Sequence, residues 1–154
     1  MREKQVVLPL LQSYADGRTG REEVVSRVEN ETRISLRHME RYRRIYHLLS
    51  WFYEDVDEAE LYVSRQGVIQ VLSAFLSHSL SLSEIKLWVW DVSRWQMSGN
   101  EDEQNLLIEI IEMLDLTWQI APEKLNRENL EMIVQTLVNI RNPVLGLQVI
   151  MKWM

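Results

Sequence analysis

Cysteine is absent from this sequence, and glycine and proline are scarce, with 5 and 3 residues among 154. The absence of cysteine excludes disulfide scaffolds, thiolate metal sites and cysteine catalysis, and it is consistent with a reducing compartment. Because glycine and proline punctuate most turns, their scarcity leaves few turn sites. We therefore expect long helices joined by few turns.

Long apolar runs are missing as well. The N-terminal apolar run extends only from Val6 to Leu11, which is too short for a secretory signal, and no small-residue cleavage site follows it. No stretch approaches the roughly 18 apolar residues of a membrane span. We expect a cytoplasmic protein that does not engage a membrane.

Motifs for catalysis and cofactor binding are not found. The three histidines are His38, His47 and His78, and no pair of them has the spacing of metal ligands. No glycine-rich phosphate loop occurs, and no nucleophile elbow accompanies a histidine. The sequence therefore predicts a protein that is not an enzyme, needs no metal or cofactor and has no small-molecule ligand.

Positive charge is scarce after the first third of the chain. The net charge is −6, but residues 1–50 hold 10 basic and 7 acidic residues, whereas residues 51–154 hold 7 and 16. Phosphate backbones repel such an acidic chain, so we expect no nucleic-acid partner. The same field would steer a basic protein toward this one.

Helical periodicity dominates the residues that are present. We predict an all-α fold: residues 1–154 form a single domain, an irregular bundle of six to eight helices, on which the apolar tail 143–154 packs as a short helix or an extended strap. The predicted segments are 3–15, a short helix through Val24 and Val28, 36–54, 66–78, 82–97, 101–118 and 126–141.

Local signals mark the ends of these segments. Capping boxes are predicted at Thr19–Glu22 and Ser81–Glu84, in which a hydroxyl and a carboxylate satisfy the first free amides of a helix. Asn100 and Asn126 should open two further helices. Pro9 should kink or split the first one. Ser35 should cap the helix over 36–54, and Pro122 should begin a short segment. The acidic stretch 54–60 is interpreted as a turn or a frayed helix end.

Three of the six tryptophans fall within residues 88–95. On a helix over 82–97, Trp88 and Trp95 share one face and should both be buried. Trp90 lies on the opposite side, between Lys86 and Arg94. Two interpretations stay open: either the helix is buried on both faces, or Trp90 is an exposed interface anchor. The predicted core consists of Trp88, Trp95, Ile85, Val92, Phe75, Leu72, Ile110, Ile111 and Leu114.

The helix predicted over 101–118 is acidic on one face. No basic residue lies between Glu101 and Asp115, and like charges one turn apart destabilise an isolated helix by a few tenths of a kcal/mol each. Such a face either provides solubility or docks cations. The candidate partner-binding residues are Glu101, Asp102, Glu109, Glu112, Asp115 and Trp90, with the acids of 54–60 as a neighbouring or alternative site.

A basic stripe is predicted on the helix over 36–54 and the residues just before it. It consists of Arg33, Arg37, Arg41 and Arg44. The stripe is either a surface for phosphate or RNA, or a solvated face paired with acids. The acidic remainder of the chain favours the second interpretation.

The order of elements over residues 66–140 resembles one known group. An apolar helix is followed by a serine-capped helix with Leu82, Ser83, Glu84, Ile85 and Trp88, and then by an acidic helix through Leu107–Leu116. This arrangement is similar to the helical immunity proteins of bacterial polymorphic-toxin and contact-dependent growth inhibition systems. The resemblance implies an antitoxin that binds a cognate toxin domain, a basic nuclease, without catalysis. The alternative is a non-enzymatic helical scaffold or adaptor module.

Overall fold

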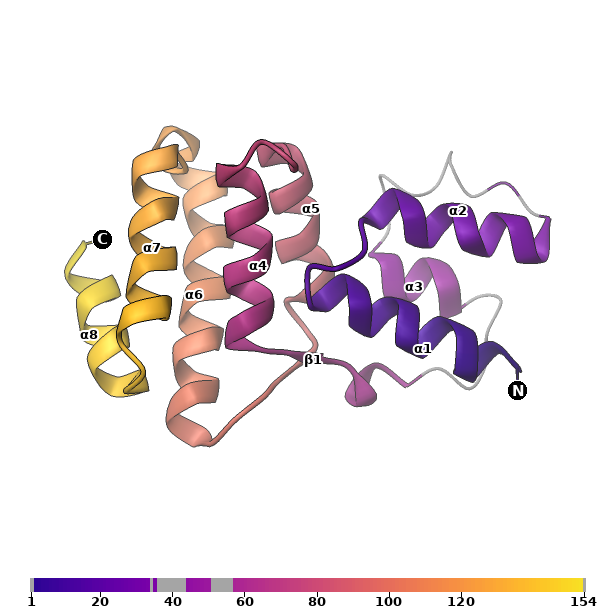
Figure 1. Ribbon diagram of the computed structural model, residues 1–154, viewed down its shortest axis with the longest axis horizontal. Helices are drawn as coiled ribbons and strands as arrows, with labels where there is room; N and C mark the ends of the chain where they lie inside the picture. The colour runs from indigo at the N-terminus through magenta and orange to yellow at the C-terminus, as the bar shows by residue number, and fades with distance from the viewer. Residues whose placement is uncertain (1, 34, 36–43, 51–56, 154) are drawn as a thin grey trace.

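Helices make up most of the computed structural model, which describes residues 2–33, 35, 44–50 and 57–153 (Figure 1). Over these residues the chain forms eight α-helices, two 3-10 helices and one pair of two-residue strands. The all-α fold class and the number of helices are therefore confirmed. Within the same residues, no helix is both long and apolar enough to cross a membrane.

The N-terminal part consists of α1 (Arg2–Ala15), α2 (Arg21–Thr32) and α3 (Ile45–Ser50). Pro9 was expected to kink or split the first helix; it does not split it, because α1 continues on both sides of Pro9. Pro9 is exposed, whereas Leu10 and Leu11 are buried beside it, and their burial offsets the hydrogen bond that proline cannot donate.

The capping box predicted at Thr19–Glu22 is also wrong. Gly20 occupies the N-cap of α2 and provides no side-chain hydrogen bond. The Thr19 Oγ1 instead lies 2.6 Å from the Ser13 Oγ, so its hydroxyl joins α1 and not α2. A helix was predicted over 36–54, and the structure describes residues 44–50 of that range. Ile45–Ser50 form α3, whereas Arg44 is not helical. Residues 36–43 and 51–54 lie outside the described residues.

The C-terminal part is a stack of five helices. Its members are α4 (Arg65–Leu76), α5 (Leu82–Val92), α6 (Glu101–Ile120), α7 (Arg127–Asn139) and α8 (Pro143–Trp153). In Figure 1, α4 lies beside α7, while α6 contacts α5 and α8. The tail after Pro143 is thus a helix and not an extended strap.

Most of the predicted helix starts in this part are confirmed. Ser81 forms a complete capping box with Glu84, in which Ser81 N donates to the carboxylate and Ser81 Oγ accepts from Glu84 N. The side chains of Asn100 and Asn126 cap α6 and α7. Pro122 begins the short 3-10 helix η2 (Pro122–Lys124), as expected. Of the acidic stretch 54–60, predicted as a turn or a frayed helix end, Glu58–Glu60 form a second 3-10 helix, η1, and residues 54–56 lie outside the described residues.

The helix predicted over 82–97 ends earlier than expected. α5 stops at Val92, and Gln96–Met97 forms strand β2, which pairs in parallel with β1 (Tyr62–Val63). Gln96 N donates to the Leu61 carbonyl at 3.0 Å, so its backbone bonds to a distant segment and not to a helix turn. Trp95 therefore reaches the core from a turn and not from a helix face.

One hydrophobic cluster connects the N-terminal helices to the C-terminal stack. Trp88 and Trp95 are both buried, and the Trp88 Nε1 donates to the Tyr14 carbonyl at 3.1 Å, which joins α5 to α1. All nine residues of the predicted core lie in or against this cluster, although Phe75 is only partly buried.

Candidate functional site

A buried carboxylate ties the two parts of the molecule together. Asp91 on α5 has no exposed surface, and its oxygens accept from the Tyr14 hydroxyl at 2.6 Å and the Arg21 Nε at 2.7 Å. They also accept from the backbone N–H of Ile45 at 2.7 Å. Four elements, α1, α2, α3 and α5, meet at this single group, which is closed to solvent and acts as a structural tie.

The same network shifts the acidity of Tyr14. Burial raises the pKa of its hydroxyl well above 10.0, and the negative charge and hydrogen bond of Asp91 raise it further, while Arg21 opposes them. Sequence reasoning missed this network. The sequence signal that could have revealed it is Asp91 itself, the one acid inside the apolar run from Leu87 to Val92. Asp91 lies one turn after Trp88 on a helix with a buried face.

The acidic face of α6 is exposed along most of its length. Glu101, Asp102, Glu109 and Glu112 are all exposed, and none of them forms an ion pair with a residue that the structure describes. Asp115 differs, because it is half-buried and accepts a hydrogen bond from the Gln119 Nε2 at 3.1 Å. Four of the five predicted docking acids therefore present free carboxylates to solvent.

The positions of these acids on α6 form one continuous surface. At 100° per residue, Glu101, Asp102, Glu109 and Glu112 fall within a sector of about 100°. The rise of 1.5 Å per residue spreads them over about 16 Å along the helix. We call these four side chains the acidic face.

Glu103 is the acid of the first turn that does not join the acidic face. Arg65 at the start of α4 binds both of its carboxylate oxygens, from Nε at 2.9 Å and Nη2 at 2.7 Å. Arg65 Nη1 also donates to the carbonyls of Leu137 and Ile140 at the end of α7. No local pattern indicates this pairing, because Arg65 and Glu103 are 38 residues apart.

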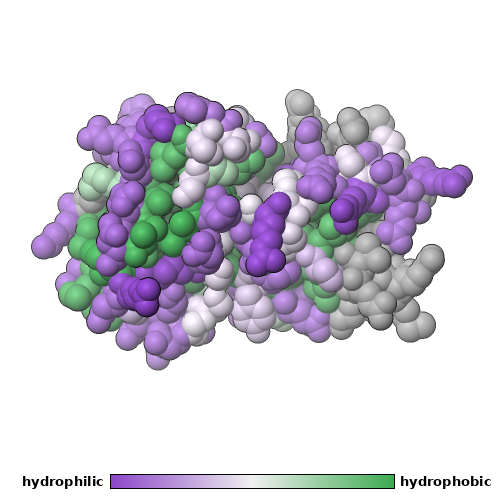
Figure 2. Space-filling view, in the orientation of Figure 1, coloured by the Kyte–Doolittle hydropathy of each residue, from purple (hydrophilic) through white to green (hydrophobic). Residues whose placement is uncertain are grey.

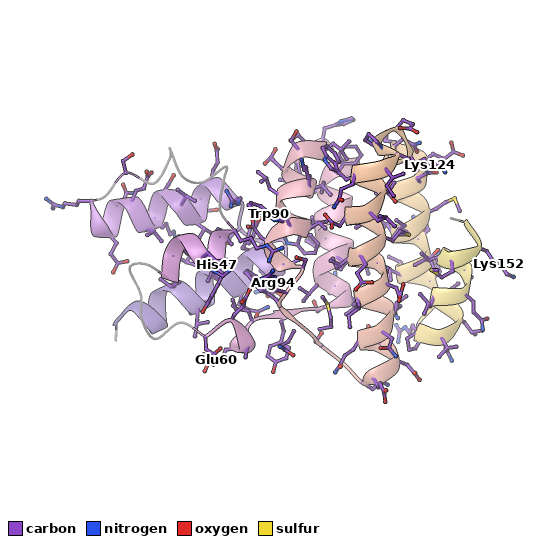
Figure 3. All side chains as sticks on the ribbon, turned by 180° about the vertical axis from the view of Figure 1, so that it is seen from behind. His47, Glu60, Trp90, Arg94, Lys124 and Lys152 are labelled. Carbon is purple, nitrogen blue, oxygen red and sulfur yellow. The ribbon has the colours of Figure 1, made fainter. Side chains whose placement is uncertain are left out.

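Of the acids of 54–60, the structure describes Asp57, Glu58 and Glu60. Asp57 accepts from Ala59 N at 2.9 Å as the N-cap of η1, and residues 54–56 lie outside the described residues. Glu60 is exposed, and Figure 3 shows it near the N-terminal helices and away from α6. The described acid Glu60 thus lies away from α6, while the acids of 54–60 as an alternative site stay a prediction.

Trp90 is neither fully core nor fully exposed. It is half-buried on α5, and the Arg44 guanidinium lies 5.8 Å from its ring centroid, an arrangement typical of a cation–π contact. Burial lowers the pKa of Arg44, and the nearby charge of Arg94 lowers it further. Lys86 lies over the ring of Trp118 at 4.9 Å instead. Trp90 thus faces the N-terminal part of the molecule and lies apart from the acidic face (Figure 3).

The predicted basic stripe does not lie on one helix. Arg33 is the C-cap of α2, with a left-handed backbone at φ 61°, and Arg44 precedes α3. Arg37 and Arg41 lie outside the described residues. The two described arginines therefore belong to different elements, which argues against a continuous helical surface for phosphate.

A groove opens at the C-terminal end of α6, where the chain turns through η2 into α7. Its volume is about 310 Å³. Leu116 and Ile120 of its wall are 50% and 72% exposed, although both are large and apolar. Sequence reasoning missed this groove. The lining residues are Met113, Leu114, Leu116, Thr117, Ile120, Ala121, Lys124, Leu125, Asn129, Leu130 and Ile133.

Metal-ligating residues do not cluster in the part of the chain that the structure describes. No group of three histidine or carboxylate side chains there could hold an ion. His47 is exposed on α3 with its ring against Tyr46, and His78 is exposed in a left-handed turn. His38 lies outside the described residues.

Comparison with protein-family models, curated proteins and solved structures gives no match to this chain. Its function is therefore inferred from the charge, exposure and shape of the described surface. Two features of that surface stand out: the acidic face of α6, and the apolar groove at the C-terminal end of the same helix.

Proposed function

We propose that this chain is a non-catalytic binding protein whose acidic face docks a basic protein partner. The observation that carries the proposal is the set of exposed carboxylates at Glu101, Asp102, Glu109 and Glu112, which have no ion-pair partner among the described residues. Acids one turn apart repel each other by a few tenths of a kcal/mol, and a cationic surface relieves that repulsion. The negative field also speeds the encounter and orients the partner.

Within this class, we propose the role of an immunity protein: a bacterial, cytoplasmic antitoxin that neutralises one cognate toxin domain in a stoichiometric complex. The resemblance of residues 66–140 to immunity proteins supports this role. A toxin that is a nuclease carries a basic surface, because it must bind phosphates. An acidic helix face that covers such a surface would block the toxin without any chemistry of its own.

The acids contribute unequally to this proposal. Glu109 and Glu112 lie in the middle of α6, where the helix dipole offers little compensation, so they are the principal docking charges. Glu101 and Asp102 are already stabilised by the positive end of the dipole. Asp115 and Trp90 have weaker claims, since Gln119 and Arg44 already contact them.

The outer face of α8 favours a second candidate function, a helical adaptor or scaffold module. Figure 2 shows hydrophobic surface interspersed with polar residues on the side of the molecule formed by α7 and α8. Four of the exposed apolar residues belong to α8 itself, at the end of the stack. Another protein could extend the stack there. These residues are Val144, Leu145, Val149 and Met151.

Co-expression distinguishes the two functions. The protein would be produced together with the product of the gene immediately upstream, which is the candidate toxin under this proposal, and growth and complex stoichiometry would be measured. An immunity protein restores growth and forms a one-to-one complex, and Glu109→Lys with Glu112→Lys weakens both effects. The matched control is Glu22→Lys with Glu23→Lys on α2, where two exposed acids are reversed on another helix. Failure of the wild-type chain to protect cells would favour the adaptor.

A further inference from the structure

We infer that the apolar groove at the end of α6 receives the apolar side chains of a basic, amphipathic helix of the partner. The inference rests on the proposed function and adds to it the source of affinity. Charge on the acidic face accelerates association, but affinity at interfaces comes mainly from a few desolvated apolar anchors. Among the described residues, the groove is the hollow next to the acidic face that can accept such apolar side chains.

The groove has a buried floor and an exposed wall. Leu125, Leu130 and Ile133 line it and are at most 9% exposed, so the floor is formed by buried side chains, and α6 packs against η2 beside them. Leu116 and Ile120 form the wall and stand out into solvent. Covering these two side chains would remove from water the apolar surface that the free protein leaves exposed, which favours binding.

The wall of the groove continues the acidic face. Leu116 and Ile120 fall in the same sector of about 100° on α6 as Glu109 and Glu112, one to two turns further along. One side of a single helix therefore presents carboxylates first and apolar side chains next. A partner helix that lies along α6 would meet both with residues spaced by one turn.

The charge around the groove selects a basic partner. Residues 109–131, which contain the wall and most of the other lining residues, hold six acids and two bases. The bases are Lys124, which lines the groove, and Arg127. Lysine and arginine side chains that flank the apolar anchors of the partner helix would be attracted to these acids. A second copy of this chain fits poorly, because the pairing would bring two acidic faces together.

A polypeptide fits the groove better than a small polar molecule does. Small-molecule sites combine an apolar lining with a few convergent polar groups that fix orientation. Here the Asn129 side-chain amide already donates to the Lys124 carbonyl at 2.6 Å, and the Asn129 backbone N–H donates to the Asn126 Oδ1 at 2.9 Å. The groove thus offers mainly apolar contact, which suits aliphatic or aromatic side chains.

The test uses a labelled synthetic peptide of about 18 residues, long enough to form a helix when bound, with leucines one turn apart and lysines elsewhere. Binding is followed by fluorescence anisotropy. A scrambled peptide of the same composition controls for charge alone. We expect saturable binding of the amphipathic peptide and at least about tenfold weaker binding of the scrambled one. In an NMR titration, the amides that shift most should lie in the C-terminal half of α6, in η2 and at the start of α7.

Variants separate the groove from the acidic face. Leu116→Ser with Ile120→Ser should weaken peptide binding about tenfold, whereas Val144→Ser with Leu145→Ser, a pair of exposed apolar residues on α8, should leave it unchanged. Equal binding to the groove variant, or no saturable binding to the wild type, would overturn the inference. If only Glu109→Lys with Glu112→Lys weakened binding, the docking role of the acidic face would stand and the groove would be excluded. A wild-type dimer that the groove variant dissociates, seen by analytical ultracentrifugation, would assign the groove to a second copy instead.

Discussion

Arg21 and Asp91 form an ion pair in which the Arg21 Nε lies 2.7 Å from the Asp91 Oδ2, and their side chains are 9% and 0% exposed. The pair joins α2 to α5, and its two residues are 70 positions apart in the sequence. With Tyr14 and the backbone of Ile45 as further donors, it holds the N-terminal helices against the C-terminal stack.

Asp91→Ala should destabilise the fold strongly. Removing the carboxylate leaves the charge of Arg21 and the hydroxyl of Tyr14 without their partner in the interior, and breaking a buried pair costs about 3–5 kcal/mol. Urea unfolding monitored by circular dichroism measures the loss. Glu23→Ala is the control, because it removes the exposed 4.0 Å pair with Arg27, which contributes less than about 1 kcal/mol. Similar losses for the two variants would show that Asp91 is not a structural tie.

The stability of the protein should fall steeply in alkali. The pKa of Tyr14 is raised in the folded state by burial and by Asp91, so the folded protein holds this proton at a pH where the unfolded chain has released it. The stabilisation is complete below pH 10.0, the ordinary tyrosine pKa, and declines as the pH rises above it. Urea unfolding between neutral pH and strong alkali measures the slope. Tyr14→Phe should flatten it, and an unchanged slope would contradict this explanation.

Arg65→Lys should also lower the melting temperature. Lysine keeps the charge but cannot reproduce the fork that binds both oxygens of Glu103 while reaching the carbonyls of Leu137 and Ile140. Hydrogen bonds to charged groups contribute about 1.5–3 kcal/mol each, so a loss of about 2 kcal/mol is expected. Arg127→Lys, an exposed change on α7, is the matched control. A thermal melt in which both variants match the wild type would show that the fork adds nothing.

Features set by short-range chemistry could be predicted from the sequence. The side chains at Ser81, Asn100 and Asn126 bond to amides three residues away, so a capping pattern identifies them without knowledge of the fold. The exposure of Glu109 and Glu112 followed in the same way from helical periodicity. Local patterns therefore gave the fold class, most helix starts and the acidic face.

Features set by distant contacts could not be predicted in this way. α5 ends before Trp95 because the backbone of Gln96 bonds to Leu61. The buried carboxylate of Asp91 is paired with donors that lie 46 to 77 residues away in the sequence. The groove depends on how α6 meets α7 after the turn at η2. The available signals were a single acid, Asp91, within an apolar helix, and two apolar residues, Leu116 and Ile120, in line with acids on α6. Neither signal specifies a contact without knowledge of the fold.

The most direct test of the acidic face is the association rate of the protein with the toxin domain that it neutralises in the co-expression experiment, measured by stopped flow at low and high salt. For the wild type, the rate should fall as salt rises, because screening weakens the field of the acidic face. Reversal of Glu109 and Glu112 to lysine should lower the rate at low salt by about tenfold or more and remove most of the salt dependence. An unchanged association rate in the reversed variant, with its fold intact, would contradict docking on the acidic face.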